Sequence, residues 1–314
     1  MTDIRQTKNY ANYLSSEGWV VERINNTNYF IRKLPLVGSI LKLQRPEKVD
    51  FGCISVLLHR YKVFQIIVEP QDEIQAKLLV IQGYKLSKSP YLPSKTLQID
   101  LTQSKEKIYA NFTKDCKYAV RKAALAVSRV HHFVGGEPTG PAVAKAMAGK
   151  GVGGFYISSY STPAEIEKWR EAWKNSVNFD RYVPSAEQLL NIKKSFPQNH
   201  SLFLASHNIS SRIIGGALFT ISSHDVSNYI TYYWYGFTNK EGRTSLSQYS
   251  LLYQGILWAK KMGCKVFDFE GVYDERFPNK SWLGFTHFKR SFGGHDVPYP
   301  GCYTKFRFPF LASK

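Results

Sequence analysis

A single lysine in the last part of the chain has neighbours that suit a ligand site. Lys289 follows Phe288 and precedes the glycine pair Gly293 and Gly294. It also lies beyond an apolar run at 266–269 that is typical of a buried strand. Open α/β sheets bind ligands at the C-terminal ends of such strands. The residue types therefore predict a cationic binding site at a strand end, with Lys289 as its first candidate.

The residues that lead to Lys289 predict a strand, a turn, a helix and a second strand. Residues 230–237 alternate β-branched and aromatic side chains, a pattern that fits a pleated surface. Polar residues and a glycine at 239–242 indicate a turn. A helix is expected from about Leu246, because apolar residues recur at three- and four-residue steps until Gly263. The run 266–271, around Asp268, then predicts a strand that is buried on at least one face.

Length and composition predict a soluble globular protein without a metal centre. The chain has 314 residues, of which 43% are hydrophobic, and this is enough for two cores of moderate size. Its four cysteines form no CxxC pair and no metal-type spacing, so we expect no metal and a reducing, cytoplasmic location. No apolar run reaches the ~20 residues of a membrane helix, so any membrane contact would be peripheral.

The charge of the chain predicts a polyanionic partner. The formal net charge is +18, which favours nucleic acid or an anionic membrane surface, although a generally basic proteome would also explain it. Part of the charge forms a stripe on a predicted helix at 105–129, opposite an apolar stripe. This stripe could position a nucleic-acid backbone, or it could be an ordinary solvated face. Its basic residues are Lys107, Lys114, Lys117 and Arg121.

The order of the predicted elements indicates two α/β units of similar plan. We expect the first unit to comprise residues 1–101 and 295–314, because the alternating tail at 303–308 reads as an edge strand that can return to it. The second unit would comprise residues 102–294. A glycine-rich segment at 134–154 formally matches GxGxxG at 149–154, but this match precedes a strand instead of following one. We therefore expect a mobile loop there.

Taken together, several motifs resemble the FemABX family of peptidoglycan-bridge aminoacyltransferases over nearly the whole chain. They are the strand 97–102 before the basic helix, the tyrosine-rich strand that ends with Tyr235-Gly236, Tyr249 on the next helix, residues 256–260, residues 268–272, and Phe288-Lys289 with Phe292-Gly293-Gly294. The resemblance implies two GNAT-like domains. It also implies transfer of an amino acid from aminoacyl-tRNA to the stem-peptide amine of a UDP-linked or lipid-linked muropeptide precursor. Aminoacyl-tRNA would be a co-substrate, and no cofactor is expected. The protein would act in the cytoplasm, in solution or peripherally at the inner face of the membrane.

The resemblance also implies roles for individual residues. Lys289 matches a lysine that would stabilise the negative charge on the ester carbonyl oxygen in the tetrahedral transition state. Phe288 matches an aromatic residue that orients this lysine, and Tyr249 matches a tyrosine of the substrate channel. Asp268 is a candidate base for the acceptor amine, or alternatively a buried aspartate that holds a turn. The other expected substrate-binding residues are Tyr235, Gly271 and Arg181, and the expected tRNA-binding residues are those of the basic stripe.

The chain departs from the family pattern on the acceptor side. Family members that bind the soluble nucleotide precursor have a lysine on the first helix, where this chain has Asn12 or Tyr13. They also have an arginine on a strand of the second domain, where this chain has Ser201. Arg181 could supply a phosphate contact instead. Glu270 replaces one glycine of the pair that usually follows the strand aspartate.

Two other functions fit part of the pattern. An acyl-CoA-dependent N-acyltransferase would share the fold, but it needs a glycine-bearing loop that binds pyrophosphate at a helix N-terminus. Residues 243–248 contain no Gly-x-Gly, which argues against CoA. A non-catalytic RNA-binding protein would use the basic helix alone, and the motif at 288–294 would then have no role.

Overall fold

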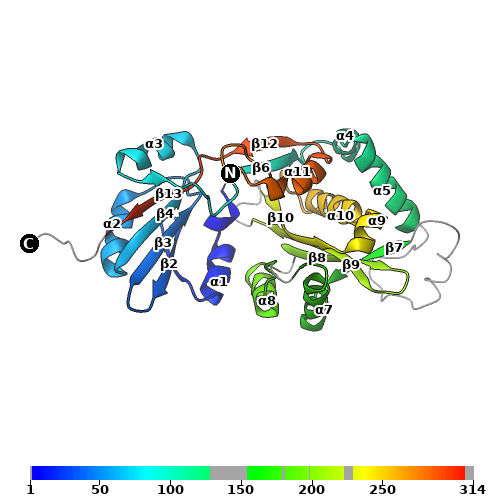
Figure 1. The fold of residues 1–314 in the computed structure, drawn as a ribbon, viewed down its shortest axis with the longest axis horizontal. Helices are drawn as coiled ribbons and strands as arrows, with labels where there is room; N and C mark the ends of the chain where they lie inside the picture. Colours follow the sequence, from blue (N-terminus) through cyan, green and yellow to red (C-terminus); the bar gives the residue numbers. More distant parts are fainter. Residues whose placement is uncertain (1, 128–153, 179–180, 198, 223–228, 308–314) are drawn as a thin grey trace, which may run out of the picture.

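Two mixed sheets lie side by side in the computed structural model, which describes residues 2–127, 154–178, 181–197, 199–222 and 229–307 (Figure 1). Helices cover both sheets, and the two sheets lie along the long axis of the molecule (Figure 1). The expected mixed α/β class with two units is therefore confirmed. The glycine-rich segment 134–154, apart from Gly154, lies outside the described residues.

The first sheet is built mainly from the N-terminal part of the chain. Its elements are η1 (Ile4–Gln6), α1 (Lys8–Ser16), β1 (Val20–Ile24), β2 (Thr27–Leu34), β3 (Gly38–Gln44), α2 (Phe51–Arg60), β4 (Val63–Glu69), α3 (Glu73–Ile81), β5 (Lys85–Leu86) and β13 (Tyr303–Phe306). The strand order is β1-β2-β3-β4-β13-β5. Tyr29 and Ile31 point toward α2 and α3 on one face. Phe30 points to the other face, where its ring lies 5.7 Å from that of Tyr10 on α1.

The second sheet is larger and carries the candidate site. Its elements are β6 (Lys95–Asp100), α4 (Lys105–Ala110), α5 (Lys114–Val127), β7 (Phe155–Tyr160), α7 (Pro163–Lys174), α8 (Ala186–Ser195), β8 (Ser201–Asn208), β9 (Ile213–Ile221), β10 (Ile230–Thr238), α9 (Lys240–Ser245), α10 (Ser247–Lys261), β11 (Val266–Gly271), η3 (Lys280–Trp282), α11 (Leu283–Arg290) and β12 (His295–Pro298). The strand order is β12-β6-β11-β10-β9-β8-β7. One core joins α4, α5 and α10 to the sheet, and a second core on the opposite face joins α7 and α8 to it.

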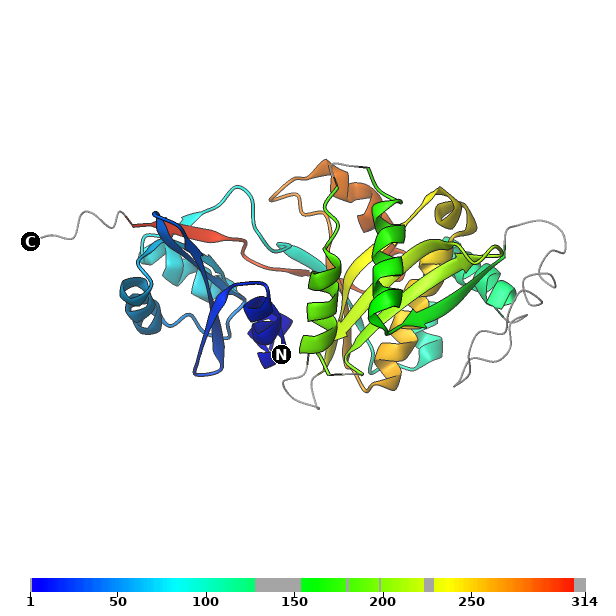
Figure 2. The ribbon, with the colours of Figure 1, turned by 90° about the horizontal axis from the view of Figure 1, so that it is seen from below.

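The C-terminal segment connects the two sheets. After β12 pairs with β6 in the second sheet, the chain crosses back and β13 inserts between β4 and β5 of the first (Figure 2). The expected return of the tail to the first unit is confirmed, but β13 is an inner strand because β5 covers its outer edge. β6 and β12, which the predicted boundaries place with the first unit, belong to the second sheet. The division into two independent domains stays a prediction.

The predicted helix at 105–129 is two helices. Its apolar stripe is buried as expected, with Ile108 3% exposed and Cys116 fully covered. The backbone breaks at Thr113, whose N–H donates to the carbonyl of Ser291 (2.9 Å) and whose hydroxyl accepts from the N–H of Cys116 (3.3 Å). This hydroxyl caps α5. A tertiary hydrogen bond thus interrupts a helix that local sequence preference would continue.

Candidate functional site

β10 and β11 separate at their C-terminal ends and open the second sheet. They are parallel neighbours, but only residues 230–232 pair with 266–268. Beyond this point β10 has a bulge between Tyr233 and Tyr235, and the bulge turns the strand locally. β11 bends at Glu270, which has φ +60°. The opening lies where parallel strands of α/β sheets take ligands.

Lys289 lies at this opening. Its side chain is buried, and its Nζ donates a hydrogen bond to the carbonyl oxygen of Gly271 at the end of β11 (2.7 Å). The ammonium lies 5.0 Å from the ring centroid of Phe285 and 5.8 Å from that of Tyr233. Both distances are within the range of cation–π attraction. The lysine therefore occupies the strand end that the sequence predicts, but it projects from α11, a helix that the sequence pattern does not indicate.

Burial and nearby carboxylates set the charge of the site. Burial lowers the pKa of Lys289 to about 8, and the carboxylates of Glu270 and Asp268 oppose this shift. Burial also raises the pKa of Asp268 to about 6, with the negative charge of Glu270 as a second cause. Lys289 is therefore mainly protonated at neutral pH, so a cation is held in a partly dry site.

Asp268 holds the backbone turn at the end of β11. Its Oδ1 accepts from the N–H of Glu270 (2.6 Å), and its Oδ2 accepts from Gln98 Nε2 (2.9 Å) and Thr96 Oγ1 (3.2 Å). The side chain is 1% exposed. Both oxygens are engaged within the protein, so the geometry favours the turn-holding alternative over the predicted role as a base.

A buried ionic network that the sequence patterns do not reveal adjoins Asp268. The guanidinium of Arg5 donates to Glu270 Oε1 (2.8 Å) and to Asp3 Oδ1 (3.2 Å). Arg45, from the end of the first sheet, donates to Asp3 Oδ2 (3.0 Å) and stacks on the ring of Tyr299 at 3.6 Å. The network thus joins the N-terminal segment and the first sheet to Glu270, near the end of β11. Its only sequence signal is an acidic residue, Glu270, at a left-handed position where glycine is usual.

Phe288 does not face the ammonium of Lys289, contrary to its predicted role. Its ring packs edge-on against Tyr249 (4.8 Å) and against Phe292 (5.7 Å). Tyr249 is half-buried and also stacks on Phe292 (5.7 Å). Successive residues of a helix point in directions about 100° apart, so a neighbour in sequence is not a neighbour in space. Phe285, one turn earlier, is the helix residue that contacts the ammonium.

Tyr233 lies beside the ammonium and is held by Gln248, a pairing that the sequence pattern does not indicate. The amide of Gln248 donates to the hydroxyl of Tyr233 (2.9 Å), while its Oε1 is buried without a hydrogen-bond partner among the described residues. A Cβ on Gly236 would lie 1.7 Å from the Tyr233 hydroxyl, so only glycine allows this ring position. Unpaired buried polar atoms are rare and often belong to ligand sites. This unpaired oxygen belongs to the side chain that holds the Tyr233 hydroxyl.

Tyr235 and Arg181 lie on the opposite side of the sheet from Lys289. Tyr235 packs against Trp173 of α7 at 5.3 Å. Arg181 is exposed in the connection between α7 and α8, where its N–H donates to the carbonyl of Asn178 (3.0 Å). The structure therefore does not bring these two predicted substrate-binding residues to the lysine.

The positions that would carry family cations hold none. Tyr13 is buried, with its ring edge-on to Trp234 at 5.8 Å, and Ser201 is buried on β8. Asn12 is exposed on α1. Recognition of a soluble nucleotide at these positions would need other residues.

The basic stripe is exposed on the same side of the sheet as Lys289. Lys107, Lys114 and Arg121 are exposed, and the ammonium of Lys117 donates to the carbonyl of Ala110 at the end of α4 (2.7 Å). The rings of Phe112 and Phe292, 5.2 Å apart, join this helical region to the segment after α11. The predicted cationic face exists; its use for nucleic acid stays a prediction.

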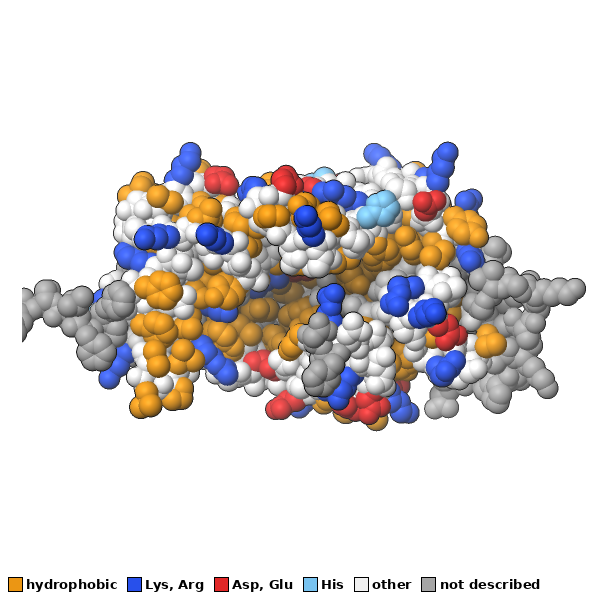
Figure 3. Space-filling model, viewed as in Figure 1, with side chains coloured by type: hydrophobic (Ala, Val, Ile, Leu, Met, Phe, Trp, Pro, Cys, Tyr) orange, Lys and Arg blue, Asp and Glu red, His pale blue; other side chains and the backbone are white. Residues whose placement is uncertain are grey.

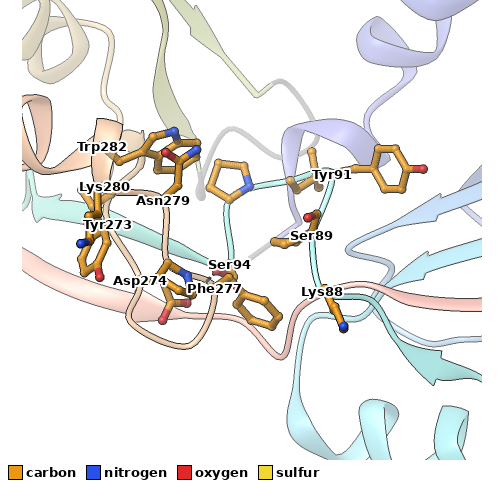
Figure 4. A pocket seen from close by; sticks show the side chains of 15 residues that line it. Lys88, Ser89, Tyr91, Ser94, Tyr273, Asp274, Phe277, Asn279, Lys280 and Trp282 are labelled. Carbon is orange, nitrogen blue, oxygen red and sulfur yellow. Dashed lines mark hydrogen bonds between the residues drawn. The ribbon is translucent and has the colours of Figure 1, made fainter.

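A groove of about 740 Å³ lies beside Gly271. One wall is the connection 88–94 between the sheets, and the other is formed by residues 272–274, 277–280 and 282 (Figure 4). Figure 4 shows Trp282 and Asn279 together on one side and Lys88 on the other, with Phe277 between them. A Cβ on Gly271 would lie 2.6 Å from the Trp282 ring and 2.9 Å from Pro93, so glycine lets both walls approach the strand end.

A space-filling view shows a hollow along the middle of one face, with hydrophobic side chains inside and Lys and Arg around it (Figure 3).

Among the described residues, no group of His, Cys, Asp and Glu is placed to hold a metal ion. None of the helices within the described ranges is long and apolar enough to cross a membrane.

Comparison with solved structures identifies the fold as a tandem GNAT-like arrangement. A tandem GNAT protein from the clavulanic acid biosynthesis pathway matches with a TM-score of 0.51 at 9% identity, covering 96% of this chain and 93% of that one. The C-terminal domain of a putative lysylphosphatidylglycerol synthetase from Agrobacterium fabrum matches with a TM-score of 0.58 at 10% identity, covering 96% and 88%.

FemX has a higher structural similarity, with a TM-score of 0.72 at 13% identity over 97% of this chain and 92% of that chain. The expected resemblance to FemABX proteins is therefore confirmed at the level of the fold. No family model and no curated protein matches the sequence.

Proposed function

We propose that this chain is an aminoacyltransferase that moves an amino acid from aminoacyl-tRNA to the stem-peptide amine of a peptidoglycan precursor. The observation that carries the proposal is the ammonium of Lys289, which is held at the opened end of β10 and β11. The similarity to FemX and to a lysylphosphatidylglycerol synthetase domain supports an aminoacyl donor. The reaction would take place in the cytoplasm, in solution or peripherally at the membrane.

In the proposed reaction the acceptor amine attacks the ester carbonyl carbon of the charged tRNA. The bond from that carbon to the ribose oxygen breaks, the amide forms, and the proton lost by the amine balances the proton gained by the ribose oxygen. Negative charge develops on the carbonyl oxygen in between. An ammonium has three N–H donors, and Gly271 takes one of those of Lys289, so others are available for this oxygen. Such stabilisation is worth about two orders of magnitude in rate.

Asp268 is engaged with the backbone N–H of Glu270 and with β6, so we do not assign it as the base that deprotonates the acceptor amine. Gln248 is a positioning candidate because its amide donates to the hydroxyl of Tyr233, whose ring lies 5.8 Å from the ammonium of Lys289. The groove lies on the other side of Gly271 from the ammonium and offers aromatic and lysine side chains to one of the two substrates. The basic stripe of α4 and α5 would bind the phosphate backbone of the tRNA.

The test is incubation with a panel of radiolabelled aminoacyl-tRNAs and with nucleotide-linked and lipid-linked muropeptides. Lys289→Met should lower transfer by about two orders of magnitude. The matched control is Arg290→Gln, whose side chain is exposed and pairs with Asp296. Failure of every donor and acceptor pair with the wild-type protein would refute the proposal.

An acyl-CoA-dependent transferase is the rival with the same fold. The residues before α10 argue against it, because the N–H of Gly242 already donates to Asn239 Oδ1 (2.8 Å) and a Cβ there would lie 2.2 Å from the carbonyl of Ile214. This glycine serves close packing and helix capping. Titration of acetyl-CoA by calorimetry separates the two functions, and tight binding would favour the rival. A non-catalytic RNA-binding role predicts instead that RNA binding is the protein's only measurable activity and that Lys289→Met leaves it unchanged.

A further inference from the structure

Helix α3 turns apolar side chains toward solvent. Ile74 and Ile81 are 74% and 76% exposed, and Leu78 is 46% exposed. Only the side of α3 with Ala76 and Leu79, which are 2% and 0% exposed, packs on the first sheet. Surface helices normally place polar residues opposite their buried side. Here the outermost stripe combines Ile74 and Ile81 with a single charged residue, Lys77, because residues three, four and seven apart share a face.

The apolar surface continues onto the neighbouring strand. Leu86 of β5 is 53% exposed, and Lys85 beside it is exposed as well. We define the α3 patch as the exposed surface formed by Ile74, Lys77, Leu78, Ile81, Lys85 and Leu86. Figure 1 shows α3 on the outside of the first sheet, and Figure 3 shows hydrophobic side chains together with Lys or Arg side chains in the same region.

The mixture of aliphatic side chains and lysines decides what can cover this patch. Neither Lys77 nor Lys85 forms an ion pair with any described residue. A protein partner would have to bury these ammonium groups against carboxylates of its own. A second copy that offered the same patch would place lysine against lysine, which is unfavourable. At a lipid surface, by contrast, the aliphatic side chains enter the boundary of the acyl chains while the lysine stems reach back to the phosphates.

We propose that the α3 patch docks the protein on an anionic lipid bilayer. The net charge of +18 attracts such a surface, and each lysine near it adds to the attraction. α3 and β5 lead directly into residues 88–94, the wall of the groove beside Gly271. Docking would therefore hold this wall close to the lipid head groups. If the proposed aminoacyl transfer is correct, this position favours a lipid-linked acceptor over a soluble one.

The test is cosedimentation of the purified protein with vesicles of phosphatidylcholine alone and with an added anionic phosphatidylglycerol fraction. The wild-type protein should bind the anionic vesicles. Ile74→Ser with Ile81→Ser should lower the partition coefficient at least about tenfold, because two aliphatic side chains no longer leave water on docking. Lys77→Gln with Lys85→Gln should lower it about fivefold per lysine on anionic vesicles and leave binding to phosphatidylcholine unchanged.

The matched control is Leu36→Ser with Val56→Ser, two aliphatic residues of the same unit that are 106% and 58% exposed but lie outside the α3 patch. It should bind as the wild type does. Absence of binding to anionic vesicles, or equal loss in the control, would overturn the proposal. So would a wild-type dimer in analytical ultracentrifugation that the α3 substitutions convert to a monomer. The assay needs no catalytic activity, so its result is independent of the proposed aminoacyl transfer.

Discussion

The ammonium of Lys289 is anchored on the carbonyl oxygen of Gly271, 18 residues earlier in the chain, at a distance of 2.7 Å. This contact fixes a cation from α11 at the end of β11 and sets the position of any negative charge that the site can stabilise. Gly271 also lies between Lys289 and the groove, so this glycine is what separates a substrate in the groove from the cation.

The activity should depend on the protonation of Lys289. Burial lowers its pKa to about 8, so the rate of transfer should fall as pH rises through that value, because the ammonium becomes neutral. The pH dependence of kcat/KM measures this limb. Glu270→Gln removes one of the charges that raise this pKa, so it should move the limb to lower pH. If kcat/KM fell at the same pH in the wild type and in Glu270→Gln, the pH dependence would not arise from Lys289.

The buried ion pair of Arg5 and Glu270 should stabilise the fold. Arg5→Met leaves the carboxylate of Glu270 without its partner in a site where its side chain is 17% exposed, and we expect a loss of about 3 kcal/mol in the free energy of unfolding. Urea denaturation measures it. The control is Arg60→Met, which breaks an exposed pair with Glu22 and should cost less than about 1 kcal/mol. Equal losses would contradict the assigned role.

Gly236→Ala should displace the ring of Tyr233. The added Cβ would lie 1.7 Å from the tyrosine hydroxyl, so we expect the stability to fall by about 1–3 kcal/mol and the transfer rate to fall as well. Gly284→Ala is the control, since a Cβ there meets nothing within 4 Å and alanine favours the helix. Thermal unfolding and the transfer assay, applied to both variants, check the expectation, and an unaffected Gly236→Ala protein would show that the ring position is not required.

Replacing Lys114, Lys117 and Arg121 by Gln should weaken tRNA binding and flatten its salt dependence. Each lost phosphate contact lowers the slope of log K against log salt by about one. Filter binding at several salt concentrations gives this slope. The control replaces Lys168, Lys174 and Lys194, exposed lysines on α7 and α8 at the opposite face of the sheet. An unchanged slope for the first variant would leave the stripe as a solvated face.

Local pattern predicts most strands and helices but not their partners. The run at 97–101 reads as a strand in the sequence, but its sheet is set by contacts such as that of Thr96 with Asp268, 172 residues away. The pair of Arg5 and Glu270 spans 265 residues and has no local signal beyond an unusual glutamate. The pattern does not predict α11, because this helix is short and its N-cap residue, Trp282, supplies no side-chain cap. Its lysine was nevertheless found, because the flanking aromatic and glycine residues form a recognisable motif.

The crossing of β13 back to the first sheet limits how far the two sheets can move apart. Only five Cα steps join Pro298 at the end of β12 to Tyr303 at the start of β13, a reach of at most about 17 Å when fully extended. The other crossing, from Leu86 to Lys95, is longer. The short crossing acts as a tether, because it keeps the end of β12 and the start of β13 within about 17 Å of each other. If the proposed aminoacyl transfer is correct, we expect the folded body of the tRNA to stay outside this crossing and only its terminus to reach Lys289.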